Sequence, residues 1–150
     1  MKQINFRQWQ FQCDIETTRS AYNQVLMGSA DKCNCEDCRN YVLNIDKAFP
    51  LEILSLFEQM GIDYTKEAEV YSIGKPESGL LLYNGWLHFI GHMKGLDVFN
   101  NPNNISWDLT TISDTFKIGF TKHISLSHQS FDHQPLIQIE FFTEIPWTYK

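Results

Sequence analysis

Apolar and polar residues alternate along several stretches of the chain, and a period of two is typical of β-strands with one buried face. The first such stretch carries four inward-facing residues, which are Trp9, Phe11, Cys13 and Ile15. Ile4 and Phe6 have the opposite parity, so we expect a β-bulge near Arg7 and Gln8 to restore the phase. The chain is therefore predicted to begin with a half-buried strand that points the Cys13 thiol inward.

Six further strands follow from the same alternation and from enrichment in β-branched and aromatic residues. They cover residues 69–73, 80–83, 86–92, 105–109, 116–126 and 137–145. Asn84-Gly85 separates the second of these strands from the third, and this dipeptide tolerates the positive φ angles of a type I′ turn. We therefore expect a β-hairpin with its tip at Asn84-Gly85. Residues 76–79 predict a turn, and residues 100–104 predict a loop because Pro102 interrupts them.

A period of three to four residues from Cys35 onwards predicts an amphipathic helix. Asn34 is a good N-cap for this helix, and the acidic pair Glu36 and Asp37 follows in the first turn, where the helix dipole favours negative charge. Pro50 disfavours helical geometry at the residue before it, so the helix is expected to end at Phe49.

Two other helices are predicted. A broad apolar stripe covers residues 51–60, with Pro50 suited to the first turn and Gly61 to the C-terminal stop. A shorter helix is expected within residues 17–28, capped by a threonine and ended by Gly28 in a left-handed conformation. The two helices joined at Pro50 should cover one face of a sheet.

The order of these elements, with helices early and strands in a run, predicts an α+β fold: a single domain over residues 1–150, with an antiparallel β-sheet and two main helices packed on one face. A chain of 150 residues can bury a core that needs no disulfides. We find no internal repeat and no interdomain linker.

The net charge and the hydropathy of the chain limit the classes of partner that we expect. The formal net charge is −6 without any cluster of basic residues, so we expect no nucleic-acid partner. The longest apolar tract, residues 79–89, is far short of a membrane span, and residues 1–10 lack the apolar run of a signal peptide. These features predict a cytoplasmic protein with no membrane partner, whose cysteines are reduced thiols or metal ligands.

The spacing Cys33-x-Cys35-x-x-Cys38 is the main candidate site, with Cys13 as a fourth ligand. Zinc prefers four thiolate or imidazole ligands in a tetrahedron, and a loop that runs into a helix can aim several sulfurs at one point. Against this interpretation, Cys38 and Cys13 lie on apolar faces, where free cysteine behaves as a small hydrophobe. The second CxxC pair of stronger zinc signatures is also missing. Zinc ligands and inert buried thiols therefore both remain open.

A third interpretation is redox chemistry, because Cys35 and Cys38 form a CxxC pair at a helix N-terminus, where the dipole favours a thiolate. Glu36 and Asp37 oppose the thiolate by their negative charge, and Arg39 offsets part of that effect. The pair also lacks the strand and crossover helix of a thioredoxin-like unit. We rank this interpretation below the other two.

The histidines give weaker candidates. On a strand, His88 and His92 would lie ~13 Å apart, which is too far to share one metal. His128, Asp132 and His133 cluster in a serine-rich loop that could hold a metal or a small ligand, although such loops are more often solvated turns.

Two aromatic residues and several missing motifs bear on partners and activity. Tyr83 and Trp86 flank the predicted hairpin tip, where they could pair across the strands or anchor a protein partner. The chain has no phosphate-binding GxxxxGK[ST] loop, no GxGxxG, no GxSxG and no HExxH. The commonest devices of nucleotide-binding proteins and hydrolases are therefore missing, and an enzyme is unsupported.

Four segments carry a resemblance to a family. CNCEDCRNYV, GIDYTKEAEVY, LLYNGWLHFIGH and the late EIPW resemble a family of small uncharacterised bacterial and phage-associated proteins with CxCxxCRN, GIDxxKxxEVY and YxGWxHFxG segments. The resemblance covers Cys33 to Trp147 and implies a bacterial-type intracellular protein. It transfers no catalytic role and does not extend to Cys13. The residues that it brings to notice are Cys33, Cys35, Cys38, Arg39, Asn40, Gly85, Trp86, His88 and Gly91.

Together these observations predict a non-enzymatic intracellular binding or interaction module with a protein or small-molecule partner. A zinc ion at the cysteine cluster is one of the open interpretations of that cluster. The alternative from another class is a thiol redox enzyme that uses Cys35 and Cys38.

Overall fold

Among the described residues, seven antiparallel strands form one sheet in the order β1-β2-β4-β7-β6-β5, with β3 paired to β4 outside this path. The structure is a computed structural model that describes residues 1–75, 78–99 and 109–150. The strands are β1 (Lys2–Phe6), β2 (Trp9–Cys13), β3 (Glu69–Gly74), β4 (Leu81–Lys94), β5 (Thr110–Ser113), β6 (Phe116–Thr121) and β7 (Leu136–Ile145). The predicted α+β class with an antiparallel sheet is confirmed.

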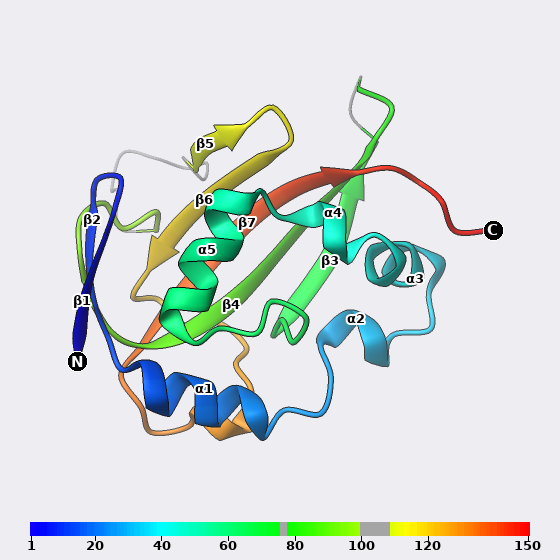
Figure 1. The fold of residues 1–150 in the computed structure, drawn as a ribbon. Helices are drawn as coiled ribbons and strands as arrows, with labels where there is room; N and C mark the ends of the chain where they lie inside the picture. The colour runs from blue at the N-terminus through cyan, green and yellow to red at the C-terminus, as the bar shows by residue number, and fades with distance from the viewer. Residues whose placement is uncertain (76–77, 100–108) are drawn as a thin grey trace.

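The helices found in the described residues lie on one face of this sheet and around its edges. They are α1 (Ile15–Asn23), α2 (Ser29–Lys32), α3 (Glu36–Leu43), α4 (Ile45–Ala48), α5 (Leu51–Met60) and the short 3-10 turn η1 (Gln129–Phe131). Figure 1 shows α4 and α5 across one face of the sheet, with α2 and α3 beside β3. Helix α5 ends at Gly61 with a φ of 78°, as predicted, whereas Pro50 is its N-cap and not part of its first turn. In the part of the chain that the structure describes, no helix has the length and apolar character needed to cross a membrane.

Phe49 occupies the centre of the core between α5 and the sheet. Its ring centroid lies 5.0 Å from that of Phe141 on β7, and 5.6 Å from those of Phe57 on α5 and Phe116 on β6. Phe49 is extended rather than helical because Pro50 follows it, and this geometry turns the ring inward. Burial of such aromatic side chains stabilises the fold by roughly 1.5–3 kcal/mol each.

The predicted hairpin at Asn84-Gly85 is wrong, because both residues lie in the middle of the continuous strand β4. The Asn84 side chain is buried, donates to the Phe141 carbonyl at 2.9 Å and accepts from the Tyr71 hydroxyl at 2.7 Å. A Cβ on Gly85 would stand 2.6 Å from the Phe141 ring and 2.8 Å from the Glu69 carbonyl oxygen. The dipeptide serves close packing between strands, and long-range partners outweigh its turn propensity.

Strand β4 pairs with β3 and β7 along its first part and with β2 along its last four residues. Gly91 marks the change of partner, with a φ of 152° and no room for a Cβ beside the carbonyl group of Gln12. Tyr83 donates its hydroxyl to a carbonyl in α3, whereas Trp86 donates to Leu126 O. These two rings are therefore not the cross-strand pair that the hairpin prediction required.

The single helix predicted from Cys35 to Phe49 is interrupted at Asn44, which ends α3 and precedes α4. The buried Asn44 side chain donates to the Asn40 carbonyl at 2.9 Å and to the Thr148 hydroxyl at 2.9 Å. A side-chain amide that bonds to backbone groups competes with the helical ladder, so the helix turns here.

Three local predictions near the N-terminus also need correction. Arg7, with a φ of 51°, lies in the turn between β1 and β2, so the expected bulge is a hairpin turn. Helix α1 is capped by Asp14, whose carboxylate accepts the Thr17 N–H at 3.1 Å, rather than by a threonine. Gly28 is extended and precedes α2 instead of ending a helix.

Later segments give a mixed outcome. Strand β7 confirms the prediction for residues 137–145, whereas β6 ends at Thr121, short of the predicted residue 126. The predicted loop at 100–104 and most of the predicted strand at 105–109 lie outside the described residues, as does part of the turn at 76–79.

Candidate metal centre

Cys33, Cys35 and Cys38 are brought together where α2 passes into α3. Their three sulfur atoms all lie within 4.8 Å of one another, and the sulfurs of Cys33 and Cys35 are 3.2 Å apart. Cys33 directly follows α2, Cys35 is the N-cap of α3, and Cys38 lies in the first turn of α3. The three cysteines thus converge on one point, and this group could hold a metal ion.

Backbone amides stabilise the sulfurs. The Cys35 sulfur accepts a hydrogen bond from the Cys38 N–H at 3.3 Å, and the Cys33 sulfur accepts one from the Cys35 N–H at 3.5 Å. Such donors favour a thiolate over a thiol. The predicted N-cap at Asn34 is therefore wrong: the cap is the Cys35 sulfur, and Asn34 Oδ1 accepts instead from the Arg39 guanidinium at 3.5 Å.

Cys33 and Cys38 differ in how readily they ionise. The hydrogen bond from the Cys35 N–H lowers the pKa of Cys33, and the sulfurs of Cys35 and Cys38 lower it further. Burial raises the pKa of Cys38, and the neighbouring sulfurs add to that effect. A bound cation would favour the thiolate form of both, since thiols that coordinate a metal are deprotonated.

Cys13, the predicted fourth ligand, lies apart from the three-cysteine group. It lies on β2 with no exposed surface, donates its thiol to the Met60 carbonyl at 3.5 Å and is not part of the three-cysteine group. Burial raises the pKa of Cys13 to about 11, so the group stays a neutral thiol. The strand parity that points this residue inward places it against the end of α5, where it acts as a small hydrophobe.

The geometry of the three remaining cysteines fits zinc. Zinc–sulfur bonds of ~2.3 Å in a tetrahedron place sulfurs roughly 3.8 Å apart, which is within the spread of these three atoms. Among the described residues, no histidine, aspartate or glutamate offers a further ligand atom to the group. Three protein ligands leave one position of a tetrahedral ion for another donor, the arrangement of zinc sites that bind a water or a substrate.

Helix α2 is held in place from the segment that leads into β3. Glu67 accepts the Ser29 N–H with its carbonyl at 3.1 Å and the Ala30 N–H with its carboxylate at 2.8 Å. The Ser29 hydroxyl donates to Glu69 Oε1 at 2.8 Å. These bonds satisfy the first amides of α2, which has no side-chain cap of its own, and so position Cys33.

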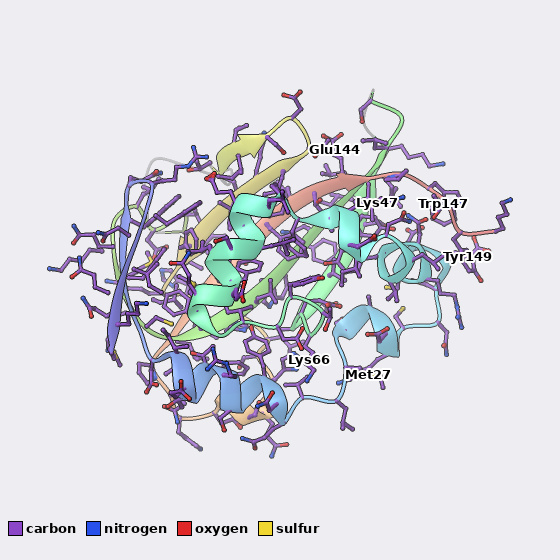
Figure 2. All side chains as sticks on the ribbon, viewed as in Figure 1. Met27, Lys47, Lys66, Glu144, Trp147 and Tyr149 are labelled. Carbon is purple, nitrogen blue, oxygen red and sulfur yellow. The ribbon has the colours of Figure 1, made fainter. Side chains whose placement is uncertain are left out.

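Asn40 holds α3 against the segment after β7. Its Oδ1 accepts the N–H groups of Thr148 and Tyr149 at 2.8 and 3.1 Å, and its Nδ2 donates to the Pro146 carbonyl at 3.0 Å. Figure 2 shows Trp147 and Tyr149 next to this helix. A fully buried amide that uses both of its polar ends holds the cysteine helix against the chain segment after β7. In the sequence, only the family resemblance indicates that Asn40 is a special position.

The histidine candidates divide into structural and surface groups. His88 is buried, contacts Gln138 Oε1 through Nε2 at 3.0 Å, and has its pKa lowered to about 4 by burial. It is therefore neutral and part of the core. His128 and His133 lie at a surface hollow together with Asp132, but they form no metal-ligand group among the described residues.

Two buried carboxyl groups were not predicted as special positions. Glu140, on β7, accepts from Gln138 and Asn84, and burial raises its pKa. Glu67 is only 1% exposed, and burial raises its pKa to about 7. Both residues lie in stretches where isolated acidic residues read as solvated positions, so the sequence carried no signal for their burial.

Comparison with protein-family models, with curated proteins and with solved structures found no match for this chain.

Proposed function

We propose that the chain is a metal-binding interaction module in which Cys33, Cys35 and Cys38 hold one zinc ion. The convergence of the three sulfurs within 4.8 Å is the observation that supports this proposal most directly. Two backbone amides donate to sulfurs in the group, as expected of a site prepared for thiolates.

A zinc ion would link α2 to α3 through its three cysteine ligands. Cys33 reaches the site from α2, which is bonded to the residues around β3. Cys35 and Cys38 belong to α3, which is bonded to the segment after β7 through Asn40. The role of the ion is therefore to hold α2 and α3 in place relative to β3 and the segment after β7, in a cytoplasmic protein whose cysteines stay reduced.

Metal analysis of purified protein tests the proposal. We expect about one equivalent of zinc per chain, and we expect Cys35→Ser to lower both the metal content and the melting temperature, because metal binding to the folded state adds to the free energy of folding. Cys13→Ala is the matched control, which removes a thiol outside the group and should keep the zinc. A stable, metal-free protein whose melting is unchanged in Cys35→Ser would refute the zinc proposal.

A second candidate is thiol redox chemistry, and one observation favours a revised version of it. The sulfurs of Cys33 and Cys35 are 3.2 Å apart, and hydrogen bonds lower the pKa of Cys33. The nucleophile would then be Cys33, with Cys35 as its partner, rather than the predicted pair of Cys35 and Cys38. The two thiols would lose two electrons and two protons to a disulfide substrate, which would leave as two thiols.

Alkylation kinetics distinguish the two candidates. In chelator-treated protein, a redox function requires fast alkylation that depends on Cys33, persists below neutral pH and disappears in Cys33→Ser. Zinc binding alone requires protection of all three thiols by the metal and restoration of slow alkylation when zinc is added back.

A further inference from the structure

A hollow adjoins the candidate metal centre. It measures about 470 Å³, which is within the ~300–1,000 Å³ typical of small-molecule sites, and Cys33 forms part of its wall. Lys32, Glu69 and His128 line the same hollow. A metal held by Cys33 would therefore lie at the wall of a space that can admit a small molecule.

The hollow continues away from the cysteines. A second hollow of about 760 Å³ shares Lys32 and His128 with the first, and it extends to Asp132. Its loop wall is fixed by side-chain bonds: His128 Nε2 lies 2.8 Å from the Lys66 carbonyl, and the Ser130 hydroxyl donates to Ala21 O at 2.8 Å. The two hollows therefore adjoin each other and are together called the cleft, and the bonds that fix their shared wall lower the cost of ordering on binding.

Charges of both signs line this cleft. Lys32 takes part in none of the ion pairs found among the described residues, so its ammonium group remains for a ligand. Glu69 uses Oε1 to accept from Ser29 and from its neighbour Val70, which leaves Oε2 for another donor. A ligand with one carboxylate and one ammonium group would find a partner for each.

Besides Lys32 and Glu69, the proposed zinc ion itself offers a place for a ligand, because three cysteines leave its fourth coordination position open. A zinc ion with three thiolates is a soft centre, for which a further sulfur is a favourable donor. We propose that the cleft binds a small amino acid that carries a thiol, with its sulfur on the metal, its carboxylate at Lys32 and its ammonium group at Glu69. On binding, the thiol S–H bond breaks, a metal–sulfur bond forms, and the proton passes to solvent. This inference rests on the proposed metal site.

Cobalt substitution provides the test, because Co²⁺ takes zinc sites and its absorption reports the donors around it. The protein is loaded with one equivalent of Co²⁺ and titrated separately with L-cysteine, mercaptoethanol and L-alanine. We expect L-cysteine to shift the d–d bands at a concentration about tenfold lower than mercaptoethanol, since it alone combines the sulfur with both charges. L-Alanine, which has the charges without the sulfur, should leave the bands unchanged.

Substitution of Lys32 separates recognition from metal binding. Lys32→Ala should have the same cobalt spectrum as wild type. The preference for L-cysteine, which is the ratio of the mercaptoethanol and L-cysteine concentrations that shift the d–d bands, should fall to near unity. Lys47→Ala removes an exposed lysine of α4 that does not line the cleft, and it should keep the preference.

The outcomes are distinct. Failure of the protein to bind Co²⁺ through its cysteines refutes both the metal site and this inference. Normal cobalt binding refutes the inference alone if thiols cause no spectral shift, if L-alanine acts like L-cysteine, if the preference survives in Lys32→Ala, or if L-cysteine strips the metal from the protein during gel filtration.

Discussion

Replacing Glu67 with Gln should stabilise the protein at neutral pH, because the fold buries this carboxyl group with incomplete hydrogen bonding. Oε1 accepts the Ala30 N–H at 2.8 Å, whereas Oε2 has no partner among the described residues. Burial raises the pKa of Glu67 to about 7 from an ordinary value of 4.5, and the nearby charges of Asp31 and Glu69 also raise it. A glutamine keeps the acceptor for Ala30 and carries no charge to bury.

The magnitude follows from the two pKa values. Their difference, at about 1.36 kcal/mol for each pH unit, gives a cost of roughly 3 kcal/mol for ionised Glu67 in the fold. The folded pKa is the higher one, so this cost is absent below pH 4.5, where Glu67 is protonated in both states. The stability of the protein falls as the pH rises from 4.5 through 7, and the cost is complete above that range. The gain from Glu67→Gln should therefore be under about 1 kcal/mol at pH 5 and reach about 3 kcal/mol at pH 8.

Urea unfolding of both proteins at several pH values between 5 and 8 measures this difference. A chelator is present throughout, so that metal binding to the cysteines does not add its own pH dependence. Glu58→Gln is the matched control, because Glu58 is exposed on α5 and its substitution should change stability by a few tenths of a kcal/mol at every pH. A difference between Glu67→Gln and wild type that does not grow with pH would refute the argument.

Three further perturbations test the packing and the metal site. Gly85→Ala should lower the free energy of unfolding by about 1–3 kcal/mol, because the added Cβ meets the Phe141 ring; an unchanged denaturation midpoint would contradict this packing. Asn40→Ala should make the segment after Ile145 more sensitive to limited proteolysis, since two backbone N–H groups lose their acceptor; equal cleavage rates would contradict it. Chelator treatment should lower the melting temperature of wild type but not of Cys35→Ser, and equal shifts would show that the chelator acts elsewhere.

Local patterns predicted the elements whose partners are mainly apolar. Strand β2 and helix α5 follow from periodicity, and Pro50 and Gly61 mark the ends of α5 because both residues restrict or extend the backbone directly. The convergence of Cys33, Cys35 and Cys38 was also predictable, since their spacing fits one turn of chain that leads into a helix.

The errors at Asn84 and Asn44 share a physical cause. Both residues favour a turn or a cap locally, yet each has a buried amide with a hydrogen-bond partner far away in the sequence. Such hydrogen bonds form only once the sheet is assembled, so they cannot be predicted from the residues that are neighbours in the sequence.

The position of α2 and α3 next to β3 also bears on how the edge of the sheet is protected. This strand pairs with β4 on one side, and α2 and α3 contact it. An unpaired strand edge is a template for β-pairing with another chain, and proteins protect such edges by covering them. The bond from the Ser72 hydroxyl to the Asp37 carboxylate ties the cover to the edge. Loosening of the cysteine segment would therefore uncover β3, so that the same cluster guards the protein against edge-to-edge aggregation.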